Sequence, residues 1–196
     1  MLAVAERVFA ERGFRAASVD VIAAGAEISK PMLYAYFGSK EGLFAAAAED
    51  AGDRLRARVR EVVEVPGLKP DRRLWAGFLE VFAFVEDHRD AWLVLYPGGE
   101  TASGSVGPGA RRARDAMAHL LTELFRSTAL EAGMGEQAAE QTEMLAHAVT
   151  GATIASASWW LEHRDEPKEL PALRLMNLVW SGFGGLMGGR IWVPDP

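Results

Sequence analysis

Two pairs of side chains have the types and the spacing to bind a metal ion. His119 and Glu123, like Glu143 and His147, are four residues apart, so each pair would lie on one face of a helix. Neither pair has a third ligand at a spacing typical of zinc sites, and isolated pairs rarely complete a site. We therefore expect each pair to stabilise its helix or to add polarity to a pocket, and we predict no metal and no cofactor.

No part of the sequence supplies a nucleophile together with a base and an oxyanion hole. Ser103 and Ser105 lie in the segment 97–109, which is rich in glycine and serine. This segment has neither the Gly-x-Ser-x-Gly elbow of serine hydrolases nor the Gly-Lys-Ser/Thr ending of a phosphate-binding loop. The chain contains no cysteine, which excludes thiolate catalysis and disulfide bonds. We predict no catalytic residues and expect that the protein is not an enzyme.

A pattern that indicates DNA binding runs from residue 18 to residue 44. Ser18 and Ser29 are favourable N-caps, and Pro31 falls in the first turn of the second helix, where its missing N–H costs little. Two short helices joined by a turn at residues 25–27 form the helix-turn-helix arrangement, whose second helix enters the major groove of DNA. The same arrangement occurs in many all-α proteins, so the pattern alone leaves DNA binding open.

Five short sequences in this region stand at a characteristic spacing. In chain order they are Phe-Ala-Glu-Arg-Gly-Phe, Ile-Ala-Ala, Ile-Ser-Lys, Leu-Tyr-x-Tyr-Phe and Ser-Lys-Glu, and they fall within residues 2 to 46. In these sequences the chain resembles the N-terminal domain of the TetR family of bacterial transcriptional repressors. The resemblance implies a homodimer that binds a palindromic double-stranded DNA operator and is released from it by a small hydrophobic effector.

The resemblance also implies which side chains contact DNA. Lys40 is the best candidate for a phosphate contact on physical grounds, because its ammonium would stand beside the exposed amides of a helix N-terminus. Met32 and Pro31 can offer only apolar contact, for instance to a thymine methyl group. The expected DNA-contacting residues are Ser18, Lys30, Pro31, Met32, Tyr34, Tyr36 and Lys40, of which Ser18, Tyr34 and Lys40 are expected to hold phosphates.

Three features depart from the usual pattern of the family. Glu27 occupies the turn position where the family usually has glycine, Val21 replaces an acidic or polar residue, and no basic arm precedes the first helix. Glu27 would repel phosphate, and the turn would force it into a conformation that residues other than glycine tolerate poorly. These departures keep a second function open, that of an all-α small-molecule-binding or scaffold protein that no longer binds DNA.

Composition and charge limit the kind of DNA binding. Of the 196 residues, 49% are hydrophobic and 24% are charged, as in ordinary soluble domains. The net charge is −6, whereas residues 1–60 carry nine Lys and Arg against eight Asp and Glu, a balance of +1. We therefore expect binding through a few placed contacts rather than a strong basic field. The most apolar segment, residues 175–189, is shorter than a membrane span, and we expect a cytoplasmic protein without a membrane partner.

Helical periodicity continues through the rest of the chain, without an alternating strand pattern. We predict an all-α fold of about nine helices, with a helix-turn-helix domain at residues 1–46 and an effector-binding and dimerisation domain at residues 47–196. A long helix is expected to start at Lys40. Arg54 follows Asp50, and Glu64 follows Arg60, by four residues, so we expect the arginines of this helix to form salt bridges rather than a DNA-binding patch.

The last two helices carry the surface that is expected to form the dimer. Small residues follow one side of the first helix and an apolar stripe follows the second, and the TetR resemblance pairs both with a second copy in a four-helix bundle. The alternative is that the same residues pack within one subunit. The expected interface residues are Gly151, Ala152, Ala155, Leu175, Val179, Gly182, Phe183 and Leu186.

An effector pocket is expected among the helices between residues 72 and 158, which carry more large apolar side chains than a minimal bundle needs. The alternative is a filled core, but the TetR resemblance favours a cavity for a small hydrophobic molecule. We expect Tyr96, His147 and Thr150 to orient this ligand. The expected lining residues are Phe78, Phe82, Trp92, Tyr96, Met117, Leu121, Met144, His147 and Thr150.

Overall fold

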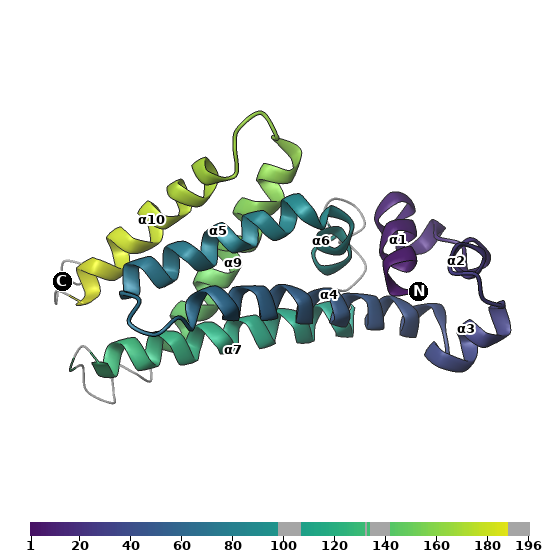
Figure 1. Ribbon diagram of the computed structural model, residues 1–196, viewed down its shortest axis with the longest axis horizontal. Coiled ribbons are helices and arrows are strands. Elements are labelled where there is room, and N and C mark those ends of the chain that lie inside the picture. The colour runs from purple at the N-terminus through teal and green to yellow at the C-terminus, as the bar shows by residue number, and fades with distance from the viewer. Residues whose placement is uncertain (98–106, 132, 134–141, 188–196) are drawn as a thin grey trace, which may run out of the picture.

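The computed structural model of the protein describes residues 1–97, 107–131, 133 and 142–187, with side chains in the last helix as far as residue 182. The described residues form nine α-helices and no strand, which confirms the predicted all-α fold. Helices α1 to α3 form a small unit at one end of the molecule, and α4 runs from this unit along the rest (Figure 1). The helices are α1 (Leu2–Ala16), α2 (Val19–Gly25), α3 (Lys30–Phe37), α4 (Lys40–Val63), α5 (Pro70–Asp87), α6 (Arg89–Leu95), α7 (Pro108–Glu131), α9 (Thr142–Glu162) and α10 (Glu169–Met187).

Ser29 caps α3 as the sequence predicts, whereas the predicted cap at Ser18 makes no capping hydrogen bond. The hydroxyl of Ser29 accepts a hydrogen bond from the backbone N–H of Met32 at 3.3 Å, and the hydroxyl of Ser39 accepts one from Gly42 at 3.0 Å. Gly38 stands between α3 and α4 with a φ of 72°, which glycine adopts without strain. Caps and a turn residue thus define where the second helix of the motif begins and ends.

An N-terminal core holds α1 to α3 against the start of α4. Leu33 of α3 is fully buried in it, and the rings of Phe14 and Phe44 meet with their centroids 5.2 Å apart. Helix α1 kinks at Gly13, which has a φ of 70°, and continues as far as Ala16. Val94 of α6 also belongs to this core, so the small N-terminal unit packs against α6 as well as α4.

A larger core lies among the helices from α4 to α10, and α4 contributes to both cores. Ala47 and Ala48 belong to the N-terminal core, whereas Ala51 and Leu55 belong to the larger one. One uninterrupted helix therefore carries residues of each core in successive turns. The domain boundary at residue 46 stays a prediction.

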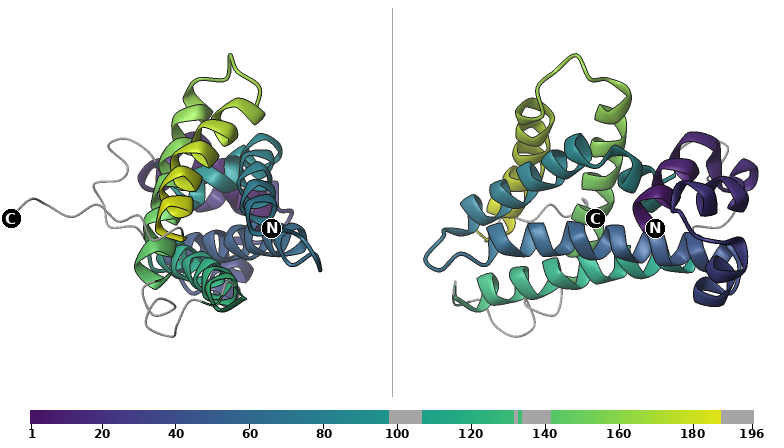
Figure 2. Two further views of the ribbon diagram at one scale, coloured as in Figure 1. Left: turned by 90° about the vertical axis from the view of Figure 1, so that its left-hand side faces the viewer. Right: turned by 45° about the vertical axis from the view of Figure 1, so that its right-hand side comes forward.

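Helices α4 and α7 lie side by side along much of their length (Figure 2). A methyl group on Gly109 would lie 2.4 Å from the carbonyl oxygen of Ala45, and one on Gly52 would lie 2.4 Å from Cβ of Ala113. Both distances are far below van der Waals contact, so the two helices meet where only glycine fits. This close packing makes α7 a second long support for α4.

The arginines of α4 form salt bridges, as predicted, and do not form a free basic patch. Arg54 binds Asp50 at 3.0 Å, and Arg60 binds Glu64 at 3.3 Å. Both spacings are the i, i+4 spacing seen in the sequence. These charges are therefore already neutralised within the helix.

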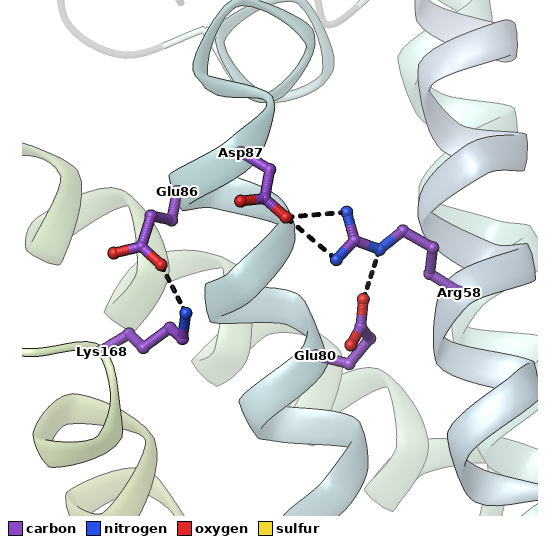
Figure 3. A network of polar contacts seen from close by, with 5 residues as sticks. All are labelled: Arg58, Glu80, Glu86, Asp87 and Lys168. Atoms are coloured by element: carbon purple, nitrogen blue, oxygen red, sulfur yellow. Dashed lines mark hydrogen bonds and ion pairs between the residues drawn. The ribbon is translucent and has the colours of Figure 1, made fainter.

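Arg58 has a longer reach and ties α4 to α5 (Figure 3). It binds Glu80, and both of its terminal nitrogens donate to one oxygen of Asp87 at 3.1 Å. On the other side of α5, Glu86 accepts from Lys168, which directly precedes α10. Charged contacts thus hold α5 between α4 and the start of the last helix.

Candidate DNA-binding surface and effector pocket

Helix α3 has one buried face and presents its remaining side chains outward. Leu33 is fully buried, whereas Tyr36 is 69% exposed. An exposed face of this kind is what a recognition helix needs to reach base edges. The five predicted DNA-contacting residues of α3 are all exposed: Lys30, Pro31, Met32, Tyr34 and Tyr36.

Lys30 forms an ion pair with Asp20 of α2, and its Nζ lies 3.0 Å from the carboxylate. The hydrogen bond to Asp20 raises the pKa of Lys30, so the ammonium stays charged at neutral pH. Both side chains are exposed, so water and salt screen the pair. A DNA phosphate can therefore compete with Asp20 for this lysine.

Lys40 does not stand free beside the N-terminal amides of α4, which corrects the expectation from the sequence. Its ammonium donates to the backbone carbonyl of Arg15 at 3.0 Å and lies 5.0 Å from the centroid of the Phe14 ring. The hydroxyl of Ser39 caps the start of α4 instead. Lys40 therefore joins the start of α4 to the end of α1 in this structure.

Ser18 and Glu27 flank α2 and differ in their backbone. Ser18 is extended, and its hydroxyl makes no hydrogen bond that caps the helix, unlike Ser29 and Ser39. Glu27 has a φ of 56°, in the left-handed region that disfavours residues with a Cβ. This confirms the expectation that the turn places Glu27 in an unfavourable conformation.

An apolar pocket lies among α4, α5, α6, α7 and α9. It encloses about 700 Å³ of space between atoms, a figure that includes solvent at its mouth. Leu55, Val59 and Val63 of α4 form one wall. Sites for small organic ligands have this combination of concave shape and mainly apolar lining. Six of the nine predicted lining residues do line it: Phe78, Trp92, Tyr96, Met117, Leu121 and Thr150.

Three of the predicted lining residues lie elsewhere. Phe82 is fully buried, but its ring packs against Trp160 at a centroid distance of 5.6 Å instead of lining the pocket. Met144 is 67% exposed and His147 is also exposed. The buried stripe of α9 runs through Ala146, Thr150, Thr153 and Ala157, and both Met144 and His147 lie outside it.

The polar groups of the pocket were only partly predicted. Burial raises the pKa of Tyr96 to about 12, and the nearby positive charge of Arg114 partly opposes this shift. Tyr96 therefore keeps its hydroxyl proton at neutral pH. Three polar residues that line the pocket were not predicted: Arg73, Thr128 and Thr153. Arg73 precedes Gly77 by four residues on the inward stripe of α5, and this spacing could have placed it at the pocket.

The predicted dimer residues divide between two faces of the structure. Gly151 and Ala155 of α9 and Gly182 of α10 are exposed, and a methyl group on either glycine would meet no atom within 4 Å. Ala152 is partly buried.

Leu175 is only 3% exposed and belongs to the larger core, so its assignment to the dimer surface is wrong. Val179 also packs partly against this core. The outward side of α9 and α10 carries other large apolar residues instead, among them Trp159 and Leu178. Phe183 and Leu186 lie outside the described side chains.

The two histidine–glutamate pairs are exposed, both on α7 and on α9. Within the part of the chain that the structure describes, no three His, Asp or Glu side chains come together to hold a metal ion. Among the same residues, no helix has the length and the apolar character needed to cross a membrane.

A helix-turn-helix with an exposed second helix, joined by one long helix to an all-α domain with an apolar pocket, is the architecture of a DNA-binding transcriptional regulator. The family model for bacterial regulatory proteins of the tetR family matches residues 1–47, and the model for the tetracyclin repressor-like C-terminal domain matches residues 70–182. The chain belongs to the TetR family of bacterial transcriptional regulators.

Similar proteins support this assignment. A TetR-like transcriptional regulator from Rhodococcus sp. RHA1 has 33% identity and a TM-score of 0.71, over 94% of this chain and 93% of that chain. The HTH-type transcriptional activator FasR of Mycolicibacterium smegmatis is 28% identical over 186 residues, which are 93% of this chain and 81% of FasR. Both are regulators and not enzymes, as predicted for this chain.

The fold also matches a protein that was solved with a ligand. FadR from Bacillus subtilis, in complex with stearoyl-CoA, has a TM-score of 0.74 and 16% identity, over 92% of this chain and 96% of that chain. At this identity the match shows a common fold.

Proposed function

We propose that this TetR-family regulator is a dimeric repressor, and that a small, mainly hydrophobic effector bound in the apolar pocket releases it from a palindromic operator. The observation that carries the proposal is the course of α4. Leu55, Val59 and Val63 of this helix form a wall of the pocket, whereas Leu43 of the same helix is fully buried in the N-terminal core. A ligand that displaces the wall therefore moves the DNA-binding unit.

The proposed DNA contacts follow from the exposed surface of α3. Met32 and Tyr36 reach base edges in the major groove. Lys30 binds a phosphate once its ion pair with Asp20 is broken. The hydroxyl of Ser18, which does not cap α2, is free to bind a phosphate beside the first N–H groups of that helix. Lys40 contacts phosphate only if it also gives up the carbonyl of Arg15.

The effector must bind one arrangement of the protein better than the other. A ligand with equal affinity for the DNA-binding and the released arrangement shifts nothing, however tightly it binds. The mainly apolar lining favours a hydrophobic molecule with few polar groups. The Bacillus subtilis FadR, which shares this fold, was solved in complex with stearoyl-CoA, and this supports a hydrophobic effector.

The dimer is proposed to form through the outward side of α9 and α10. This side combines exposed small residues, such as Gly151 and Ala155, with large exposed apolar residues, such as Trp159 and Leu178. A second copy that covers these residues would remove them from water, and two-fold symmetry would match a palindromic operator. Two α3 helices could then enter successive turns of the major groove.

Selection of bound fragments from genomic DNA by the purified protein tests this function. We expect a palindromic site, binding at nanomolar concentration, and a lower transcript yield when the protein is added to a template that carries the site. Failure to enrich any sequence would contradict DNA-binding regulation and favour the alternative of a binding or scaffold protein. A higher transcript yield would instead show an activator, the role that FasR has in Mycolicibacterium smegmatis by its name.

A further inference from the structure

The polar groups of the pocket narrow the chemistry of the ligand. Among the described residues that line it, Arg73 is the one with a charged side chain. A cationic ligand would meet repulsion here, whereas an anionic group would meet a guanidinium.

Arg73 has no carboxylate partner within the described ranges of the chain. Its Nε atom is buried and makes no hydrogen bond, although the guanidinium has five N–H donors to satisfy. The neighbouring Asp71 pairs with Arg72 instead, at 3.8 Å. An unpaired buried donor on a positive group is costly, and a ligand carboxylate would satisfy it.

Thr150 gives a second, independent observation on another helix. Three threonines line the pocket, and two of them donate to their own helix: Thr128 to the carbonyl of Leu124 and Thr153 to that of Val149, both at 2.8 Å. Thr150 is only 4% exposed, yet its hydroxyl has no partner. Its hydroxyl is thus the one of the three that remains to bind a polar group in the pocket.

From these observations we infer that the effector is an amphipathic carboxylic acid, whose carboxylate binds Arg73 and which also accepts a hydrogen bond from Thr150. This inference rests on the proposed effector pocket and adds the chemical class of its ligand. Arg73 is in the first turn of α5, next to the connection from α4, whereas Trp92 belongs to α6, which packs against α1 of the DNA-binding unit. The apolar part of the acid therefore points from Arg73 toward α6.

The span available to that apolar part can be estimated along α4. Leu55 and Val63 both line the pocket, and eight residues of helix rise by roughly 12 Å. A saturated chain of medium length fits this span. We therefore use decanoic acid as the probe, with 1-decanol and decanoyl-CoA as comparisons of equal chain length.

Isothermal titration calorimetry of the full chain tests the inference. We expect decanoic acid to bind at least roughly ten-fold more tightly than 1-decanol, since hydrogen bonds to charged groups are the stronger ones. Arg73→Met should abolish this preference while leaving the binding of the alcohol within about two-fold, because the methionine keeps the apolar stem. Thr150→Val should weaken the binding of the acid, because it removes the hydroxyl that has no partner within the described protein.

Arg114→Met is the matched control for the arginine, because Arg114 also has a buried, unpaired Nε but is not among the lining residues. If the unchanged protein bound the acid and the alcohol equally well, the inference of a carboxylate on the effector would be wrong, while the proposal of a hydrophobic pocket would stand. Binding of decanoyl-CoA without decanoic acid would lead to the same conclusion. A loss of acid preference in Arg114→Met but not in Arg73→Met would overturn the assignment to Arg73. If none of the three compounds bound, the effector pocket itself would be refuted as well.

Discussion

Arg54 of α4 donates a hydrogen bond to the buried carboxylate of Glu6 on α1. Glu6 is only 5% exposed, and its burial raises its pKa, although the hydrogen bond and the charge of Arg54 act in the opposite direction. Arg54 also binds Asp50 on its own helix. The contact therefore attaches the DNA-binding unit to the same helix that lines the pocket.

Arg54→Met should lower the free energy of unfolding by about 2 kcal/mol at pH 7, because it leaves a buried carboxylate without its partner. We take the lower part of the usual range because Arg54 is half-exposed. Denaturant unfolding measures the change. Arg60→Met, which removes an exposed pair with Glu64, is the control and should change the free energy far less.

The pH dependence of the Arg54→Met variant follows from the direction of the Glu6 shift. A raised pKa in the folded state means that the folded protein binds the proton more tightly, so stability is lost as pH rises through that pKa. Without Arg54 the pKa of Glu6 should rise further. The deficit of the variant should therefore shrink as pH falls below the ordinary value for glutamate, where Glu6 is protonated in both states. A deficit that stayed constant between pH 4 and pH 8 would show that Glu6 is not its source.

Glu27→Gly should stabilise the protein by about 1 kcal/mol, because glycine adopts the left-handed backbone of this turn without a clash at Cβ. It should also strengthen DNA binding at low salt, since a negative charge next to the helix-turn-helix is removed. Thermal unfolding and fluorescence anisotropy measure the two effects. Gly38→Ala makes the reverse change at a φ of 72° and should destabilise the protein by a similar amount. No gain in stability for Glu27→Gly would show that the turn relaxes at little cost.

Met32→Ala and Lys40→Ala should separate base recognition from phosphate binding. The methionine variant should change which bases are preferred and leave the salt dependence of binding unchanged. The lysine variant should weaken binding to all sequences and reduce the slope of log affinity against log salt by about 0.9 for each lost phosphate contact. Lys40→Ala also removes the contact to the carbonyl of Arg15, so its melting temperature must be measured alongside. An unchanged slope in Lys40→Ala would show that Lys40 does not contact a DNA phosphate.

Leu178→Glu should dissociate the proposed dimer. Leu178 is 72% exposed in one subunit, and the proposed interface would bury the new carboxylate without a partner. Sedimentation velocity at micromolar concentration should show a monomer for this variant and a dimer for the unchanged protein. Leu130→Glu places the same charge on an exposed leucine of α7 and should leave the dimer intact. Dissociation by both variants would point to loss of fold rather than loss of an interface.

The parts of the structure that depend on neighbours in sequence were predicted, and those that depend on tertiary packing were predicted less well. Ser29 and Gly38 define a helix by their own chemistry, so their roles follow from the sequence. Met144, His147 and Leu175 lie on helices with apolar residues on more than one side. Tertiary packing decides which side of such a helix turns inward. Met144 and His147 were predicted to be inside and are exposed, whereas Leu175 was predicted at the dimer surface and is buried. Arg73 was missed because an arginine next to Arg72 is typical of a solvated position, whereas Arg73 lines the pocket.

The ion pair between Lys30 and Asp20 affects how the protein searches a genome. An approaching duplex meets a lysine whose field is already compensated, in a unit whose first 60 residues carry a balance of only +1. We therefore expect attraction to random-sequence DNA to be weak, and we expect Lys30 to exchange Asp20 for a phosphate only where the proposed base contacts of α3 also form. Such a protein would dissociate quickly from non-specific DNA, and its occupancy of the operator would depend on base contacts more than on electrostatic attraction to phosphates.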